Sequence, residues 1–436
     1  MDSEFFRPDY VEAEERVRKC NVQDLGRLGG FVPGPFGSAF HVENYDFKSP
    51  YRYIRGQDVK PFFVLAEDER YIPKADFLRL GRYAVRTNDL MISVVGTLGN
   101  VAVCTPHETP AMFSCKSTLF RTQSADPYYL LAYLNSEGGQ MCILRRQRGA
   151  IQGGLNIEDL RTIPVPRFEG KVESTIAASI KAAHGALIAS RDNYSQALHL
   201  LGSELGLDNL TFQKTVGYTP SFSELETSRR FDAQHYQPRF SALRHHLTKF
   251  PISRFRDIRT YNHRGVQPVY VAGGEIAVVN SQHLGPKHIN YDGLDRTTLS
   301  AFQASPEAHI RKDDLLLYST GAYVGRTNVY LLKAPAQASN HVNILRLVPE
   351  VDAAYMAVVF QSVVGQFQTQ NHSRGSAQAE LYPADIDRFV VPLLDPKTQR
   401  RIGDLVRESL AKEQESKALL AQAKQRVEEL IQQAIK

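Results

Sequence analysis

An internal repeat is the feature that most constrains the fold of this chain. Residues 86–96 read RTNDLMISVVG and residues 311–321 read RKDDLLLYSTG, an offset of 225 positions. Farther along, residues 148–152 (RGAIQ) align with residues 374–378 (RGSAQ) at an offset of 226. Self-similarity at one slowly drifting offset indicates that a whole folding unit has been duplicated. We therefore expect two copies of one type of domain.

The repeat reaches both ends of the duplicated unit. Near the start of the chain, residues 6–10 (FRPDY) resemble residues 236–240 (YQPRF) at an offset of 230. In each central block an acidic turn leads into an apolar run, a glycine turn and a second apolar run, which predicts a β-hairpin. Near the end of the unit, the pairs matched at an offset of 226 are Leu155 with Leu381, Asp159 with Asp385, and Pro166 with Pro392.

Each copy of the repeat is followed by the pattern of a long helix. Residues 168–207 contain no proline, and small or apolar side chains recur at steps of four and three, which predicts a helix packed along a partner helix. This seam comprises Ile176, Ile180, Ala183, Leu187, Ser190, Tyr194, Ala197, Leu201 and Leu205. A second seam, within residues 396–436, comprises Ile402, Val406, Leu420, Ala423, Val427 and Leu430. Its middle carries Ser409, Glu413 and Ser416, so we expect looser packing there or a face that meets something else.

The segments between the predicted helices have the pattern of α+β domains. Short β-rich runs at residues 51–54, 90–95, 315–318 and 342–347 are separated by Gly, Pro, Asn and Asp turns. A shorter helix is expected near the end of each copy, at residues 128–135 and 353–364. The predicted order is a globular domain at 1–166, a long helix and linker at 167–214, a second globular domain at 215–392 and a second long helix at 393–436.

Composition narrows the class of protein. The 436 residues are 42% hydrophobic and 23% charged, as in ordinary globular proteins, and the formal net charge is only +5. No run approaches 18 apolar residues and the chain opens with MDSE, so we expect a cytoplasmic protein with no membrane segment. None of the four cysteines, Cys20, Cys104, Cys115 and Cys142, forms a CxxC pair, so we expect no zinc cage and no disulfide framework, but buried, reduced thiols.

The order of motifs, occurring twice, resembles the specificity subunit of type I restriction-modification systems. The resemblance rests on residues 5–8 (FFRP) and 232–238 (DAQHYQP) as domain openings, on residues 269–274 (VYVAGG), and on residues 149–166 and 375–392 as domain-to-helix junctions. It covers nearly the whole chain. The fold it implies has two target-recognition domains separated by two long antiparallel coiled-coil helices, related by pseudo-two-fold symmetry.

The resemblance implies a DNA-reading subunit with no catalysis of its own. Each recognition domain would read one half of a split target in double-stranded DNA. The helices would fix the spacing and hold two DNA methyltransferase subunits, which motor-nuclease subunits can join. The methyl donor S-adenosylmethionine would belong to the methyltransferase, and this chain would carry no cofactor. A helix of about 35 residues is roughly 50 Å long, or about one and a half turns of B-DNA, which suits two separated half-sites.

The sequence offers no clear catalytic or metal site. The glycine-rich residues 29–37 lack the Lys-Ser/Thr of a phosphate-binding loop, so we expect a structural or DNA-facing loop. The acidic pair Asp313 and Asp314 matches Asn88 and Asp89 in the other copy, which favours a strand-initiating turn over a metal site. A Pro-Pro-aromatic methyltransferase motif is absent.

DNA contact is expected at matched loops of the two copies. Phosphates bind guanidinium and ammonium groups, whereas Arg pairs with guanine and Asn or Gln with adenine. The candidate residues are Arg145, Arg146, Arg148 and Gln152 in the first copy, Asn371, His372, Arg374 and Gln378 in the second, and Asn100 and Arg326 after the hairpin turns. An alternative for Arg148 and Arg374 is that they cap the helix junction that follows.

Two other functions remain open from the sequence. One is a stand-alone DNA-modifying or nuclease protein whose motifs are not recognised. The other is a helical scaffold that binds proteins and never reads DNA. Activity of the purified chain without a partner would favour the first, and DNA binding with a steep salt dependence and a sequence-specific remainder would argue against the second.

Overall fold

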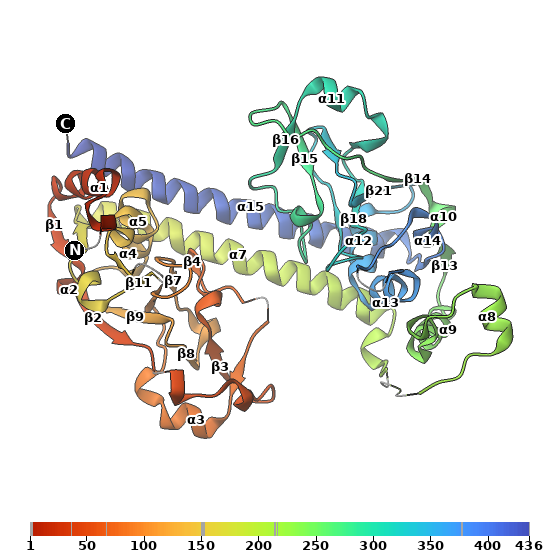
Figure 1. Ribbon diagram of the computed structural model, residues 1–436, viewed down its shortest axis with the longest axis horizontal. Helices are drawn as coiled ribbons and strands as arrows, with labels where there is room; N and C mark the ends of the chain where they lie inside the picture. Colours follow the sequence, from red (N-terminus) through yellow and green to blue (C-terminus); the bar gives the residue numbers. More distant parts are fainter. Residues whose placement is uncertain are drawn as a thin grey trace. The chain divides into compact units, whose positions relative to one another are not determined.

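The computed structural model describes residues 3–35, 37–66, 68–149, 153–212, 215, 217–375 and 378–435. The chain divides into two compact units, Met1–Leu187 with Glu413–Lys436, and Ile188–Lys412. Two long helices, α7 (Gly170–Glu204) and α15 (Pro396–Gln433), each contribute one part to each unit, and in Figure 1 they run in opposite directions. The α+β class and the two long packed helices predicted from the sequence are confirmed.

The first unit combines a mixed sheet, a smaller sheet and short helices with its share of α7 and α15. Its other α-helices are α1 (Pro8–Arg18), α2 (Leu25–Leu28), α3 (Lys74–Arg79), α4 (Pro127–Leu134), α5 (Glu137–Leu144) and α6 (Ile157–Leu160). Its strands are β1 (Val22–Asp24), β2 (Gly29–Pro33), β3 (Tyr51–Ile54), β4 (Phe62–Phe63), β5 (Tyr71–Ile72), β6 (Leu90–Ser93), β7 (Val101–Val103), β8 (Ala111–Phe113), β9 (Ser117–Thr122), β10 (Gln147–Arg148), β11 (Gly154–Leu155) and β12 (Pro164–Pro166).

The second unit repeats this plan. Its other α-helices are α8 (Phe222–Ser228), α9 (Pro238–Leu247), α10 (Phe255–Ile258), α11 (Leu299–Gln303), α12 (Ala353–Gln361), α13 (Val363–His372) and α14 (Pro383–Ile386). Its strands are β13 (Ile252–Arg254), β14 (Arg259–Arg264), β15 (Ile276–Val279), β16 (Asp295–Thr297), β17 (His309–Ile310), β18 (Leu315–Tyr318), β19 (Thr327–Val329), β20 (Ala336–Ala338), β21 (Val342–Leu347) and β22 (Val390–Pro392).

The strand order shows that the sequence repeat is also a structural repeat. The larger sheet has the order β2-β9-β6-β7-β4 in the first unit and β14-β21-β18-β19 in the second. The registers correspond, because Ile92 pairs with Thr118 and Leu317 pairs with Asn343, each shifted by the offset of 225. The two-stranded pairs β1-β12 and β13-β22 also correspond. The predicted hairpins are therefore confirmed in both copies.

The predicted acidic turn directly precedes an inner strand of each larger sheet, β6 in the first unit and β18 in the second. Asn88 and Asp313 have φ values of 70° and 69°, a left-handed conformation that Asn and Asp tolerate better than most residues. The next residue in each copy, Asp89 or Asp314, is a buried carboxylate that binds an arginine of the neighbouring strand, Arg121 or Arg346. These carboxylates therefore brace two adjacent strands, as expected of a strand-initiating turn.

Hydrophobic cores join each sheet layer to the helix pair. In the first unit, Ile176 and Ile180 of α7 and Val427 of α15 are buried in one cluster with the strands and α4. In the second unit, Tyr194 of α7 and Ile402 of α15 are buried in a cluster with α12 and the central strands. The seam side chains predicted from periodicity therefore form the base of both cores. At the end of α15, Ile431 is the buried residue of the seam, whereas the predicted Leu430 is only partly buried.

The middle of the second seam is closely packed at Ser409 and meets another element, so the second of the two expected alternatives, a face that meets something else, is confirmed. Ser409 is fully buried, and its hydroxyl donates to the backbone oxygen of Ser190 at 2.7 Å. The ring of His288 lies 2.8 Å from the same hydroxyl through Nε2, so a globular loop meets the helix pair here. Ser416 is also buried. Small side chains let the backbones of the two helices approach closely, and hydrogen bonds satisfy the buried hydroxyl of Ser409.

Two other expectations are wrong in part. The first five residues of the glycine-rich stretch form strand β2, paired with β9, rather than a loop. Glycine is required at position 29 because a Cβ there would lie 2.1 Å from the backbone oxygen of Arg121 on the paired strand. The cysteines are free as expected, but Cys115 is exposed while the other three are buried. Among the described residues, no helix is long and apolar enough to cross a membrane.

Candidate nucleic-acid interface

Three loops meet at one edge of the first unit, which we call the first turn edge. The backbone N–H of Val94 donates to the oxygen of Lys116 at 2.9 Å, and the N–H of Leu155 donates to the oxygen of Val94 at 3.1 Å. These bonds join the β6–β7 turn, the turn before β9 and the loop that ends at β11. Lys116 and Arg148 are exposed along this edge.

The second unit builds the same edge from the matching loops, and we call it the second turn edge. The N–H of Ser319 donates to the oxygen of His341 at 3.0 Å, and the N–H of Leu381 donates to the oxygen of Ser319 at 2.9 Å. His341, Arg374 and Gln378 are exposed on it. The repeat therefore brings predicted site residues of both copies to equivalent edges. Gln152, the repeat mate of Gln378, lies outside the described residues.

Arg148 and Arg374 make the same ion pair in the two units. The guanidinium of Arg148 lies 2.5 Å from Asp159 at helix α6, and that of Arg374 lies 2.8 Å from Asp385 at helix α14. The arginine side chains remain 64% and 54% exposed. The alternative expected from the sequence, a bond to the helix junction, is therefore present. Exposed guanidinium groups of this kind are typical phosphate ligands.

Arg145 and Arg146 are parts of the scaffold rather than of an exposed loop. Arg146 is 4% exposed, and its guanidinium binds the carboxylate of Glu14 at 2.8 Å and the backbone oxygen of Thr162 at 2.8 Å. Arg145 stacks over the ring of Phe5 at 4.3 Å and also reaches Glu14, at 3.1 Å. Burial raises the pKa of Glu14, but the hydrogen bonds from Arg146 and from neighbouring arginines outweigh it, so this pKa lies below its ordinary value.

Their counterparts in the second unit, Asn371 and His372, are also internal. Asn371 is 3% exposed, and its amide donates to the backbone oxygen of His235 at 2.6 Å. The ring of His372 stacks on Phe389 with 5.7 Å between centroids, and burial lowers the pKa of His372 to about 4. A histidine with this pKa is neutral at pH 7 and presents no charge to phosphate. Neither residue lies where the sequence-based prediction placed it, on a DNA-facing loop.

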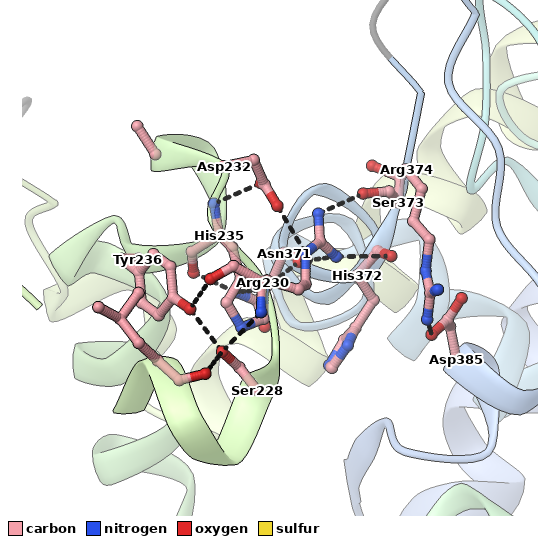
Figure 2. A network of polar contacts seen from close by, with 12 residues as sticks. Ser228, Arg230, Asp232, His235, Tyr236, Asn371, His372, Ser373, Arg374 and Asp385 are labelled. Carbon is pink, nitrogen blue, oxygen red and sulfur yellow. Dashed lines mark hydrogen bonds and ion pairs between the residues drawn. The ribbon is translucent and has the colours of Figure 1, made fainter. Parts of the chain in front are cut away.

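Figure 2 shows what holds these residues in the second unit. Arg230 donates to three successive backbone oxygens at the end of helix α13: Asn371 and His372, each at 3.1 Å, and Ser373 at 2.9 Å. A cation at this position satisfies the unpaired carbonyl groups of a helix C-terminus. The domain openings serve the same purpose in both units, since Phe5 lies against Arg145 and His235 against Asn371.

Asn100 and Arg326 make equivalent hydrogen bonds in the two units. The amide of Asn100 donates to the backbone oxygen of Val59 at 2.9 Å, and Nη1 of Arg326 donates to the oxygen of Leu284, the repeat mate of Val59, at 3.5 Å. Both side chains are partly buried. They tie the hairpin turn to a neighbouring loop, and the longer contact of Arg326 engages one of its five donors.

Aromatic side chains on the second turn edge were missed by the sequence-based prediction. Tyr323 is 53% exposed, and the guanidinium carbon of Arg326 lies 3.7 Å from its ring centroid. Tyr382 is exposed, its hydroxyl donates to Glu380 at 2.6 Å, and Arg264 lies 5.2 Å from its ring centroid. One sequence signal was available: three residues separate the glycines at 321 and 325, against two between those at 96 and 99.

The described residues hold no group of three or more His, Cys, Asp or Glu side chains that could bind a metal ion. Both turn edges carry exposed cations, and the second also carries the amide of Gln378 and the rings of Tyr323 and Tyr382, which are groups that bind phosphates and bases.

Solved S subunits match this chain along nearly all of its length. The crystal structure of the type I restriction-modification S subunit from M. genitalium has a TM-score of 0.48 and 14% sequence identity, and the match covers 95% of both chains. The HsdS subunit from Thermoanaerobacter tengcongensis has a TM-score of 0.29 and 15% identity, again over 95% of both. The type IIG restriction endonuclease BpuSI matches 40% of this chain with a TM-score of 0.31. No family model and no curated protein matches the sequence.

Proposed function

We propose that this chain is the DNA sequence-recognition subunit of a type I-like restriction-modification complex. Each unit would read one half of a bipartite target in double-stranded DNA through its turn edge. The chain would perform no catalysis and bind no cofactor, while a partner methyltransferase would bind S-adenosylmethionine. The complex would act in the cytoplasm.

The observation that carries this proposal is that two equivalent scaffolds present different side chains. Equivalent backbone hydrogen bonds form both turn edges, but the side chains differ. Lys116 of the first copy corresponds to His341 of the second, and Thr97 corresponds to Ala322, which Tyr323 follows in the longer tip. A single enzyme active site would not need two such copies. A protein that recognises two unlike half-sites needs the same scaffold in both units, with different side chains exposed on it.

The charges at the turn edges support contact with phosphate. Lys116 and Arg148 are exposed on the first edge, and Arg374 on the second, where Arg264 and Arg326 are partly exposed. Binding through two small surfaces needs local cations rather than a strongly basic chain, so the net charge of +5 is compatible with it.

Matched grooves on the helix pair suit two copies of one partner. In the second unit a groove of about 520 Å³ lies between α7 and α15, and in the first unit a groove of about 340 Å³ lies between the same helices. Their lining residues correspond at an offset of 226: Gln196 with Gln422, His199 with Gln425, Thr175 with Arg401, and Ser179 with Leu405. We propose that each groove receives one methyltransferase subunit; motor-nuclease subunits would join through that partner.

Methylation mapping tests the proposed function. Cells that express this chain with its methyltransferase partner should methylate a motif of two short half-sites separated by unread base pairs. Exchanging residues 1–166 for the corresponding domain of another such chain should change one half-site and leave the other and the spacing intact. A continuous short motif, or a motif indifferent to the exchange, contradicts the proposal, as does methylation or cleavage by the purified chain alone.

A further inference from the structure

The internal repeat separates side chains that hold the fold from side chains that differ between the units. Polar contacts that recur at the repeat offset stabilise the scaffold whatever DNA is bound. They include the Asp89–Arg121 and Asp314–Arg346 pairs, the Arg148–Asp159 and Arg374–Asp385 pairs, and the bonds of Gln140 and Gln366 to the backbone oxygens of Gly99 and Gly325. Residues that distinguish two half-sites must differ between the copies and offer donors beyond these contacts. Arg326 replaces Asn100, and its repeated contact, to the backbone oxygen of Leu284 at 3.5 Å, uses one donor, Nη1.

The clearest divergence is at the tip of the central hairpin. The base of the turn is common to both units, since the N–H of Gly99 donates to Ser93 at 3.0 Å and the N–H of Gly325 donates to Tyr318 at 2.9 Å. The second unit has one residue more between its turn glycines, which makes its tip longer. That tip carries the exposed ring of Tyr323.

Tyr323 forms a platform for Arg326. With 3.7 Å between the guanidinium carbon and the ring centroid, one face of the guanidinium lies on the ring. Its edge carries five N–H donors in a planar fork, and the fork matches the O6 and N7 acceptors of guanine in the major groove. A side chain already held in one orientation loses less conformational entropy when it binds.

We propose that Tyr323 and Arg326 form a base-reading element of the second unit, in which Arg326 binds a guanine of its half-site and Tyr323 orients Arg326. This inference rests on the proposed function. The first unit lacks the element, because Asn100 takes the place of Arg326 with its amide bound to Val59, and its shorter turn has no aromatic residue. The guanine contact therefore belongs to one half-site only.

The test uses the assembled complex with its methyltransferase partner and the duplex target found by methylation mapping. Arg326→Ala should weaken binding by about 5- to 150-fold and relax the requirement for one guanine in one half-site, because it removes the bidentate pair. Arg326→Lys should weaken binding less and keep part of the preference for guanine, because an ammonium can reach the same acceptors but lacks the planar fork that stacks on Tyr323. Tyr323→Ala should give a smaller loss at the same base pair, and Tyr323→Phe should restore binding. Lys312→Ala is the matched control, since this exposed cation precedes strand β18, at the opposite end from the turn, and should change nothing.

Two results would overturn the inference. If Arg326→Ala weakens binding but leaves the requirement for guanine unchanged, Arg326 contacts phosphate rather than a base. If every variant retains the parent motif and affinity while the parent complex methylates a bipartite motif, the proposed function stands and this reading element does not. Thermal unfolding of each variant shows that it is folded. If the parent complex shows no bipartite motif, the proposed function itself fails and the inference fails with it.

Discussion

Side chains that look alike in the sequence have different surroundings in the fold. Arg146 and Arg148 are two positions apart, yet one is buried against Glu14 and the other is mostly exposed. Asn371 was expected on a DNA-facing loop and instead holds the domain opening at His235. Local sequence cannot distinguish these cases, because Glu14 and His235 come from segments more than 130 positions away.

Stability should depend on pH through His372. The pKa of this histidine is about 4 in the folded chain, against an ordinary value of 6.5 that applies in the unfolded chain. Between these values the unfolded chain binds more protons, so stability falls as pH decreases from about 6.5 and levels off below about 4. Thermal unfolding between pH 7.5 and pH 4 should show this loss.

The variant His372→Phe provides the control for this pH dependence. A phenyl ring keeps the stacking on Phe389 and cannot be protonated, so the difference between parent and variant should widen below about pH 6.5 in favour of the variant. The pKa of the neighbouring His235 is also lowered by burial, so the variant should keep part of the slope. Equal slopes in both proteins would show that His372 does not titrate as described.

At the scale of elements, hydrophobic periodicity predicted the long helices and their seam well. Steps of three and four located most of the buried side chains of α7 and α15, whereas Leu187, Leu420 and Leu430 are only partly buried. Periodicity could not predict how the serines in the middle of α15 are satisfied, because their partners, Ser190 and His288, come from other elements. Strand β2 was missed because Gly29 is required by the close approach of a neighbouring strand, which a local pattern does not show.

Removing the hydroxyl of Ser409 should destabilise the second unit. Ser409→Ala removes two buried hydrogen bonds, to the backbone oxygen of Ser190 and to the ring of His288, which costs about 1–3 kcal/mol. Denaturant unfolding followed by circular dichroism measures this, since the chain has no tryptophan for fluorescence. Ser195→Ala, at an exposed position on α7, is the matched control and should change the free energy of unfolding by less than about 0.5 kcal/mol. Equal effects of the two changes would contradict a structural role for the Ser409 contacts.

At the scale of the whole molecule, duplication explains the organisation of the chain. Both units contain the four-strand order β2-β9-β6-β7 or β14-β21-β18-β19, with matching acidic turns and matching junction ion pairs. Each unit also takes part of both long helices, so neither copy of the repeat completes its core from its own residues alone. The grooves on the helix pair are duplicated with the rest.

Charge placed in one groove should remove one partner subunit. Leu405→Glu puts a carboxylate into the groove of the second unit, and Ser179→Glu does so at the matched position of the first. Native mass spectrometry of the assembled complex should show two methyltransferase copies for the parent chain, one for each single variant and none for the double variant. Glu408→Gln, at an exposed position of α15 that does not line the groove, should retain two. Two copies on the double variant would exclude these grooves as docking sites.

The sequence by itself determined the duplication, the α+β class, the hairpins and the two long helices, because repeats and hydrophobic periods are local or regularly spaced signals. Only the tertiary structure decided which polar side chains are structural and which are exposed. That decision depends on distant partners, such as Glu14 for Arg146 and Asp385 for Arg374, and on the single added residue that makes Tyr323 the tip of a turn. The burial and pairing of a polar side chain are properties of the packed chain, because its partner comes from a segment far away in the sequence.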